Sequence, residues 1–171
     1  MTDAAQQDAG QQDAGHHDAG QHVAASRAAD ALPVRAVGTD EEALRCWPVL
    51  RELRPHVDDQ GDFLRRWRTQ ASEGYQLVYV ESAGQVVAVA GYRVLTTMAW
   101  GRIVYIDDLV ALPVVHGGGF GALLLRHIKS VAAELGCDAV HLDTGYQRHA
   151  AHLSYLRNGF ELVCHHMSWT P

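Results

Sequence analysis

Four glycines occupy five positions between residues 117 and 121 of the 171-residue chain, where the sequence reads HGGGFGALLL. The residues before them are extended and apolar in character, and those after them have the periodicity of an amphipathic helix. Glycines at such a junction allow sharp turns and leave backbone N–H groups unobstructed, and the start of a helix favours anions. The pattern therefore predicts a phosphate-binding loop at the start of a helix over 118–135.

One interpretation of this loop is a dinucleotide-binding fingerprint. Gly117, Gly119 and Ala122 fit the pattern G-x-G-x-x-A, and Asp143 follows at about the distance of a ribose-binding acid. In that fold, however, the loop lies in the first strand–helix–strand unit, and several further units complete the parallel sheet. Only 28 residues follow Asp143. An NAD(P)-binding, oxidoreductase-type domain is therefore kept as an alternative.

Three motifs in order along the chain favour another interpretation. The run DDLVALPVVHGGGFGALLL leads from a strand into the loop, and RHAAHLSYLRNGF contains an alanine, a tyrosine four residues later and a Gly-Phe pair. Over residues 33–169 these features resemble the GCN5-related N-acetyltransferase (GNAT) superfamily. The acyl-CoA loop of that superfamily reads Arg/Gln-x-x-G-x-G/A, and this chain has His116 at its head.

The resemblance implies a fold and an activity. The expected fold is a mixed α/β domain whose central, mostly antiparallel sheet is splayed between its fourth and fifth strands and flanked by helices. The expected activity is N-acetyl transfer from acetyl-CoA to a primary amine of a small molecule or a protein, directly within a ternary complex. A non-catalytic acyl-CoA-binding sensor is a second alternative. No metal cofactor is expected.

The resemblance also assigns residues to acetyl-CoA. Backbone groups of the strand before the loop bind the pantetheine arm, and the glycine loop holds the pyrophosphate at the helix N-terminus. A histidine at the head of the loop makes one side-chain contact weaker or pH-dependent. The assigned residues are Leu109, Val110, Ala111, His116, Gly117, Gly118, Gly119, Phe120, Gly121 and Ala122.

Acetyl transfer to an amine requires a deprotonated nucleophile, a polarised thioester carbonyl and a proton for the departing thiolate. Tyr155 matches the superfamily tyrosine near the CoA sulfur, so it is predicted to be the general acid; a merely packed helix tyrosine is the alternative. Asp107 and Asp108 lie on the strand before the loop, and at most one is expected to enter the amine pocket unless a bulge intervenes. By the same resemblance, four residues are candidate acceptor contacts: Arg54, His56, Tyr92 and Arg93.

The elements that must position these residues follow the order β-α-α-β-β-β-α-β-α-β. A strand over 32–37 and two helices precede an antiparallel meander. The strands 101–112 and 138–144 are expected to be parallel neighbours with a right-handed crossover. A last extended piece is predicted over 160–169, after a helix that contains Tyr155.

Composition limits the remaining possibilities. With 47% hydrophobic residues, the chain is long enough for one sizeable core, predicted over 32–171. Residues 1–31 contain QQDAG, QQDAG and HHDAG and are predicted to be a disordered tail. The net charge of −6 gives no general attraction for nucleic acid or anionic membranes. Three scattered cysteines and no apolar leader favour a cytoplasmic protein, either a monomer or a homodimer, whose partners are acetyl-CoA and an amine.

Overall fold

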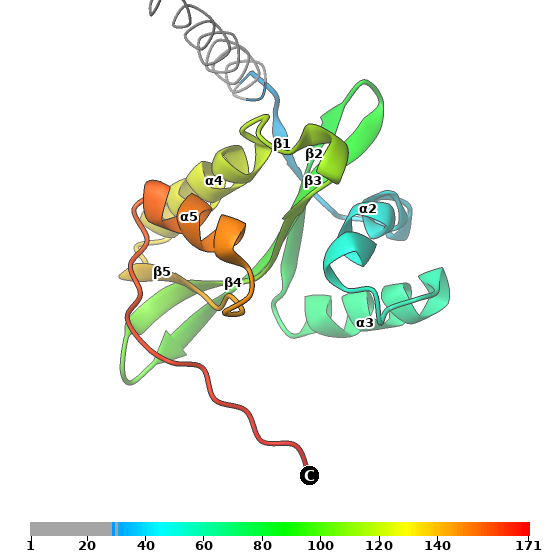
Figure 1. Ribbon diagram of the computed structural model, residues 1–171. Helices are drawn as coiled ribbons and strands as arrows, with labels where there is room; N and C mark the ends of the chain where they lie inside the picture. The colour runs from blue at the N-terminus through cyan, green and yellow to red at the C-terminus, as the bar shows by residue number, and fades with distance from the viewer. Residues whose placement is uncertain (1–28, 30) are drawn as a thin grey trace, which may run out of the picture.

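The computed structural model of the chain describes residue 29 and residues 31–171, so the predicted N-terminal tail lies almost wholly outside the described part. A five-stranded sheet has α2 and α3 on one face and α4 and α5 on the other (Figure 1). The strands are β1 (Val34–Ala36), β2 (Gln76–Ser82), β3 (Gln85–Thr97), β4 (Gly101–Ala111) and β5 (Ala139–Leu142). The helices are α2 (Asp40–Leu53), α3 (Gln60–Ser72), η1 (Pro113–Val115, a 3-10 helix), α4 (Phe120–Glu134) and α5 (His149–Arg157).

The strands lie in the order β1-β2-β3-β4-β5, and each of the first three adjacent pairs is antiparallel. The last pair, β4 and β5, is parallel and is connected through α4. The structure thus confirms the predicted mixed, mostly antiparallel sheet with one parallel pair beside the glycine loop.

The parallel pairing is short. It extends from Ile103 opposite Ala139 to Ile106 opposite Leu142, whereas β4 continues to Ala111. On its other side β4 remains paired with β3 up to Ala111. The second half of β4 therefore has a strand on one side only, and this is the predicted splay between the fourth and fifth strands.

Two apolar cores hold the helices to the sheet. On one face, Leu124, Leu125 and Ile128 of α4 are fully buried against β2, β3 and β4. On the other face, Cys46 and Val49 of α2 are buried with residues of α3, β2 and β3. Because both faces of the central strands are buried, their sequences are almost continuously apolar.

Local signals in the sequence account for the helix ends. Thr39 is the N-cap of α2, where its hydroxyl accepts a hydrogen bond from the backbone N–H of Glu42 and the Glu42 carboxylate accepts one from the N–H of Thr39. This reciprocal pair is a capping box. Pro48 lies inside α2, which continues through it to Leu53.

The C-terminal residues differ from the prediction. Residues 160–171 follow α5 without forming a strand, and every one of them from Glu161 onward is exposed. The predicted last extended piece is thus not paired with the sheet. Among the described residues, no helix has the combination of length and apolar composition that crossing a membrane requires.

Candidate active site

A β-bulge in β4 determines where the two adjacent aspartates point. In the pairing of β3 with β4, Gly91 lies opposite Asp108 and Tyr92 lies opposite Ile106, so Asp107 is an extra residue. Before the bulge, Ile106 packs in the core under α4; after it, Val110 packs against the core under α2 and α3. The extra residue therefore reverses the alternation of the strand.

Because of this bulge, both carboxylates lie on the α2–α3 face. The Asp108 carboxylate accepts a hydrogen bond from the Tyr75 hydroxyl (2.9 Å) and one from Nε of Arg54 (2.8 Å). The Asp107 carboxylate accepts one from Nε of Arg93 (2.9 Å), whose guanidinium lies over the Tyr75 ring. Regular strand alternation would place the two side chains on opposite faces, and the bulge, the exception that the sequence left open, interrupts this alternation.

Asp108 is the more enclosed of the two carboxylates. Its side chain is 10% exposed, and the Tyr75 hydroxyl that bonds it is itself in a buried residue. Gly91 makes room for this tyrosine, since a Cβ on Gly91 would lie 1.8 Å from the Tyr75 hydroxyl oxygen. Asp108 is therefore fixed by two donors and by the close approach of two strands.

Asp107 has a more open environment. Its side chain is 24% exposed and has one ion-pair partner, Arg93. Burial raises the pKa of the Asp107 carboxyl above its ordinary value, although the Arg93 guanidinium acts in the opposite direction. A carboxylate with a raised pKa is a better proton acceptor than an ordinary surface aspartate.

A large cavity opens where β4 and β5 diverge. Its volume is about 1370 Å³, and it extends from the α2–α3 side of the sheet to α5. Asp107 and Asp108 line it from β4, and Tyr155 lines it from α5. The residues predicted as catalytic are thus brought together at one opening in the sheet.

Tyr155 has the surroundings of a proton donor. Its ring packs edge-on against Phe160 with centroids 5.8 Å apart, and burial raises the pKa of its hydroxyl above the ordinary value. Within residues 31–171, no side chain or backbone group forms a hydrogen bond with this hydroxyl. Tyr155 also lines the large cavity, so a proton donor and a packed helix tyrosine both stay open as its role.

The glycine loop has the geometry that its composition predicts. Gly117 (φ 81°) and Gly119 (φ 82°) adopt left-handed conformations that other residues rarely tolerate. Gly119 is the N-cap of α4, and its carbonyl accepts the first bond of the helix, from Leu123 N (2.9 Å). The N–H groups of the first helical turn therefore have no partner within the helix and point beyond its N-terminus.

His116 is bound back onto the protein. Its Nε2 lies 3.0 Å from the carbonyl oxygen of Ala111, the last residue of β4. The side chain is thus placed between the end of β4 and the loop. The contact between His116 and Ala111 fixes the position of the loop, and Ala111 is itself one of the residues assigned to the pantetheine arm.

The candidate acceptor contacts have different locations. Arg54 and His56 line the large cavity, and both also line a second cavity of about 120 Å³ between α2, α3 and the sheet. Arg93 forms an ion pair with Asp107, which lines the large cavity. Tyr92 is buried in the core on the α4 side, where its hydroxyl donates a hydrogen bond to Oε1 of Gln76 (3.0 Å), and it lines neither cavity.

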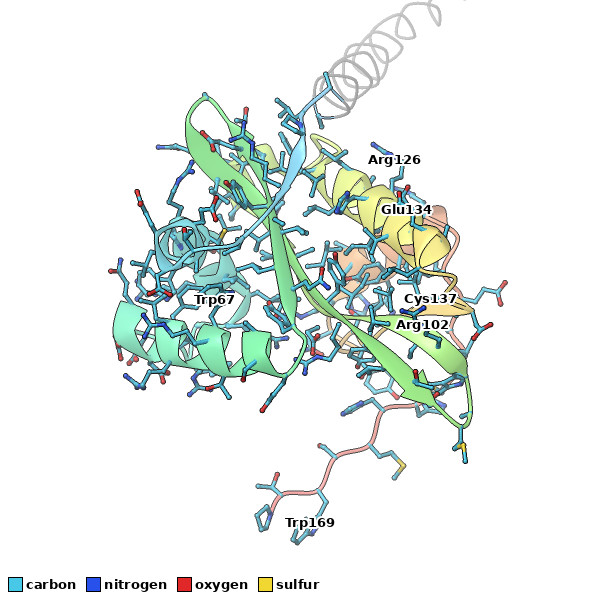
Figure 2. All side chains as sticks on the ribbon, turned by 180° about the vertical axis from the view of Figure 1, so that it is seen from behind. Trp67, Arg102, Arg126, Glu134, Cys137 and Trp169 are labelled. Carbon is cyan, nitrogen blue, oxygen red and sulfur yellow. The ribbon has the colours of Figure 1, made fainter. Side chains whose placement is uncertain are left out.

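The smaller cavity is lined largely by residues outside the predicted catalytic and binding set. Aromatic side chains of Trp47, Phe63 and Trp67 form its walls, and Asp108 and Tyr75 lie at its base. Figure 2 labels Trp67 on α3, on the side of this helix that lies toward α2. Gly91, inside the otherwise apolar sequence of β3, is the sequence signal for the bulge and for the close approach of the Tyr75 hydroxyl.

A further polar group lies at the end of β5. The Tyr105 hydroxyl donates a hydrogen bond to Asp143, whose Oδ2 is also 2.9 Å from Nδ1 of His166. No set of three or more His, Cys, Asp or Glu side chains in the described part of the chain is arranged to hold a metal ion.

Comparison with known proteins identifies the family. The model of the Acetyltransferase (GNAT) family matches residues 38–160, well over half of the chain. The chain belongs to the GNAT acetyltransferase family. The match includes the bulged strand, the glycine loop and α5.

Individual proteins are similar to this chain in sequence or in fold. The uncharacterized N-acetyltransferase YhdJ of Bacillus subtilis (strain 168) is 26% identical over 122 residues, which are 71% of this chain and 86% of YhdJ. A transcriptional regulator from Bacillus halodurans C-125 has a similar structure, with a TM-score of 0.72 and 17% identity over 81% of this chain and 99% of that one. The structure of AAC(6')-Iy in complex with a bisubstrate analog is also similar, with a TM-score of 0.68 and 14% sequence identity. The similarity covers 82% of this chain and 97% of that chain.

The GNAT family uses acetyl-CoA as acetyl donor, and this chain is a GNAT N-acetyltransferase. The dinucleotide-binding alternative is therefore wrong. The reason is visible in the fold, since the described sheet has a single parallel pair, β4 with β5, in place of a series of parallel units.

The unequal partners of the two aspartates predict unequal losses of stability. Asp108→Asn replaces an acceptor of two hydrogen bonds by a group that presents one N–H₂ donor, so we expect unfolding free energy to fall by about 1–3 kcal/mol. Asp107 has one ion-pair partner and is more exposed, so Asp107→Asn should lower the free energy of unfolding by less, about 1 kcal/mol or below. Urea unfolding of the two variants measures this; equal losses would contradict the described roles.

Proposed function

We propose that the protein transfers an acetyl group directly from acetyl-CoA to a primary amine while both are bound at the opening between β4 and β5. One observation carries the proposal: a single cavity is lined by two carboxylates that lie toward α2 and α3 and by the unpartnered Tyr155 hydroxyl from α5. A proton acceptor and a proton donor thus flank one reaction volume. AAC(6')-Iy, similar in fold, has been solved with a bisubstrate analog, CoA-S-monomethyl-acetylneamine.

The donor approaches from the glycine loop. The pyrophosphate of acetyl-CoA is held at the N-terminus of α4, by backbone N–H groups between Gly117 and Ala122. The pantetheine arm then follows β4 along Leu109 and Val110, whose outer edge has no strand partner because β5 ends at Leu142. A backbone N–H on this edge polarises the thioester carbonyl.

The acceptor approaches from the α2–α3 side, past Arg54 and His56. Asp107 receives the proton of the ammonium group, directly or through water, and the free amine attacks the thioester carbon. As the tetrahedral intermediate collapses, the C–S bond breaks and the leaving thiolate takes the proton of the Tyr155 hydroxyl. The nitrogen gives up its second proton through water to the Tyr155 phenolate, which leaves a neutral amide and restores the hydroxyl, and Asp107 releases its proton to solvent. Asp108 holds the Arg54 guanidinium and the Tyr75 hydroxyl in place at the base of the amine pocket.

Substitution at Gly121 tests the donor site. A Cβ at this position meets no atom within 4 Å, so Gly121→Leu fits the folded protein. Side chains on a helix lean toward its N-terminus, so the leucine would cover the free N–H groups. We expect the Kd for acetyl-CoA, measured by calorimetry, to rise on the order of tenfold or more.

The matched control is Ala133→Leu, at an exposed position in the last turn of the same helix. It adds the same side chain away from the loop and should leave the Kd unchanged. A folded Gly121→Leu variant with wild-type affinity would show that the pyrophosphate is held elsewhere.

Substitution at Tyr155 tests the chemical step. Tyr155→Phe removes one hydroxyl and keeps the ring that packs on Phe160, so kcat should fall about 10- to 1000-fold while the Kd for acetyl-CoA is retained. Because burial raises the pKa of the Tyr155 hydroxyl above its ordinary value, the hydroxyl stays protonated at neutral pH. The wild-type rate should decline on the alkaline side, at higher pH than an ordinary tyrosine would ionise, and this limb should be absent in the variant.

Tyr146→Phe is the control for this experiment. Tyr146 lines the same cavity but is 72% exposed, and its hydroxyl bonds His165. An unchanged kcat in Tyr155→Phe, with a verified amine and with chemistry rate-limiting, would assign the proton to solvent.

A further inference from the structure

The smaller cavity, on the face of the sheet that α2 and α3 cover (Figure 1), is an aromatic pocket. Its walls are formed by Trp47 from α2, Phe63 and Trp67 from α3, and Tyr75 directly before β2. The volume of the aromatic pocket is about 120 Å³. An apolar cavity of about 150 Å³ takes up benzene, so the aromatic pocket has the size for a branched alkyl group or for one ring that reaches its mouth.

The polar groups at the base of the aromatic pocket are already paired with one another. The Tyr75 hydroxyl donates a hydrogen bond to the Asp108 carboxylate (2.9 Å), which accepts a second one from Nε of Arg54 (2.8 Å). The Arg54 guanidinium also donates to the backbone carbonyl of Asp107 (2.9 Å). Because these groups satisfy each other, the base of the aromatic pocket favours an apolar group over a polar one.

The charged side chains that line the aromatic pocket do not cancel. They are three arginines and one carboxylate: Arg51, Arg54, Arg66 and Asp108. Arg54 pairs with Asp108, and Arg66 pairs with Asp62 (both 2.8 Å). Arg51 has no acidic partner in the described part of the chain, so one positive charge is left over.

Arg51 lies at the mouth of the aromatic pocket. The residue is exposed, and its guanidinium lies over the Trp47 ring, 5.2 Å from the ring centroid. The ring holds the guanidinium beside the opening without using its hydrogen-bond donors. A guanidinium with free donors is well suited to a carboxylate, which it can bind through two parallel hydrogen bonds.

The aromatic pocket continues into the large cavity. Four residues line both of them: Arg54, His56, Gln70 and Asp108. Asp107 precedes Asp108 on β4, lines the large cavity and has its carboxylate on the same face of the sheet. A molecule whose apolar group fills the aromatic pocket therefore has its other groups between Asp107 in the large cavity and Arg51 at the mouth.

We propose that the acceptor is an amine that also carries a carboxylate and one apolar group of up to a single ring, as an apolar α-amino acid does. The apolar group enters the aromatic pocket, the carboxylate pairs with Arg51, and the amine lies at Asp107. The inference rests on the proposed acetyl transfer for the fate of the amine, whereas recognition of the other two groups is measurable as binding alone.

Other amines lack part of this match. A polyamine brings a second cation, which the unpaired Arg51 repels, and it has no group for the aromatic walls. The first residue of a peptide has an amide in place of the carboxylate, so it leaves the Arg51 guanidinium without its anion. A small amino acid such as alanine leaves the aromatic pocket unfilled.

Three probe amines test the proposal: L-phenylalanine, L-alanine, which lacks the ring, and 2-phenylethylamine, which lacks the carboxylate. Calorimetry with the full chain saturated with CoA measures their binding without turnover, and thiol release from acetyl-CoA measures kcat/KM. We expect phenylalanine to exceed alanine by about 10- to 100-fold, because its ring is buried. It should exceed 2-phenylethylamine by about 3- to 10-fold, because of the ion pair.

The variant Arg51→Gln removes the charge and keeps most of the side-chain length. It should abolish the preference for phenylalanine over 2-phenylethylamine while binding of 2-phenylethylamine is retained, which also shows that the variant is folded. Differences in the reactivity of the two amines cancel, because the same ratio is compared in both proteins. Arg45→Gln is the matched control, since Arg45 is on the same helix and lies over the Tyr79 ring (5.8 Å) but lines neither cavity.

Four results would overturn the proposal. They are phenylalanine that does not bind the CoA-saturated protein, equal binding of phenylalanine and alanine, a ratio that Arg51→Gln leaves unchanged, and phenylalaninamide that is acetylated as fast as phenylalanine. The last result would indicate a peptide N-terminus as acceptor. The acetyl transfer fails in a different way: the expected selectivity in binding, without thiol release for any amine, would support this inference and contradict the proposed function.

Discussion

The bulge at Asp107 is the constraint on which the site depends. One extra residue in β4 turns two consecutive carboxylates to the same face and reverses the side-chain alternation of the strand up to the glycine loop. The pairing that remains with β3 is kept by Gly91, which leaves space for the Tyr75 hydroxyl against Asp108. Strand β4 thus remains paired with β3 along one edge while its Asp107 and Asp108 line the large cavity.

The early end of β5 has an equally direct consequence. Because β5 stops at Leu142 while β4 continues to Ala111, the sheet is open beyond the parallel pair. Groups from the α2–α3 face and Tyr155 from α5 can then meet at one cavity. The glycine loop follows the same strand, so β4 positions both the proposed anion site and the two aspartates.

The sequence allowed much of this arrangement to be predicted, because glycine spacing, capping residues and hydrophobic period are local signals. The parallel pair and the left-handed glycines agree with those expectations, and Tyr155 is among the residues that line the cavity. The direction of Asp108 was not predictable from strand period, since it depends on the register with Gly91 across the sheet. Tyr75, 33 residues from Asp108, carries no local sign of its contact. Residues 160–169 have a strand-like composition but pair with no strand of the described sheet.

The central claim is that acetyl passes directly from donor to amine within one cavity. Cys164 lines that cavity and is exposed, so it is the thiol that would carry an acetyl group if the enzyme itself were an intermediate. The most direct measurement is rapid-quench intact-mass spectrometry of the enzyme mixed with acetyl-CoA, before and after addition of an amine acceptor. Direct transfer predicts unmodified enzyme at every time point and acetylated amine. An acetyl-enzyme that forms without amine and is discharged by amine at the turnover rate would contradict it.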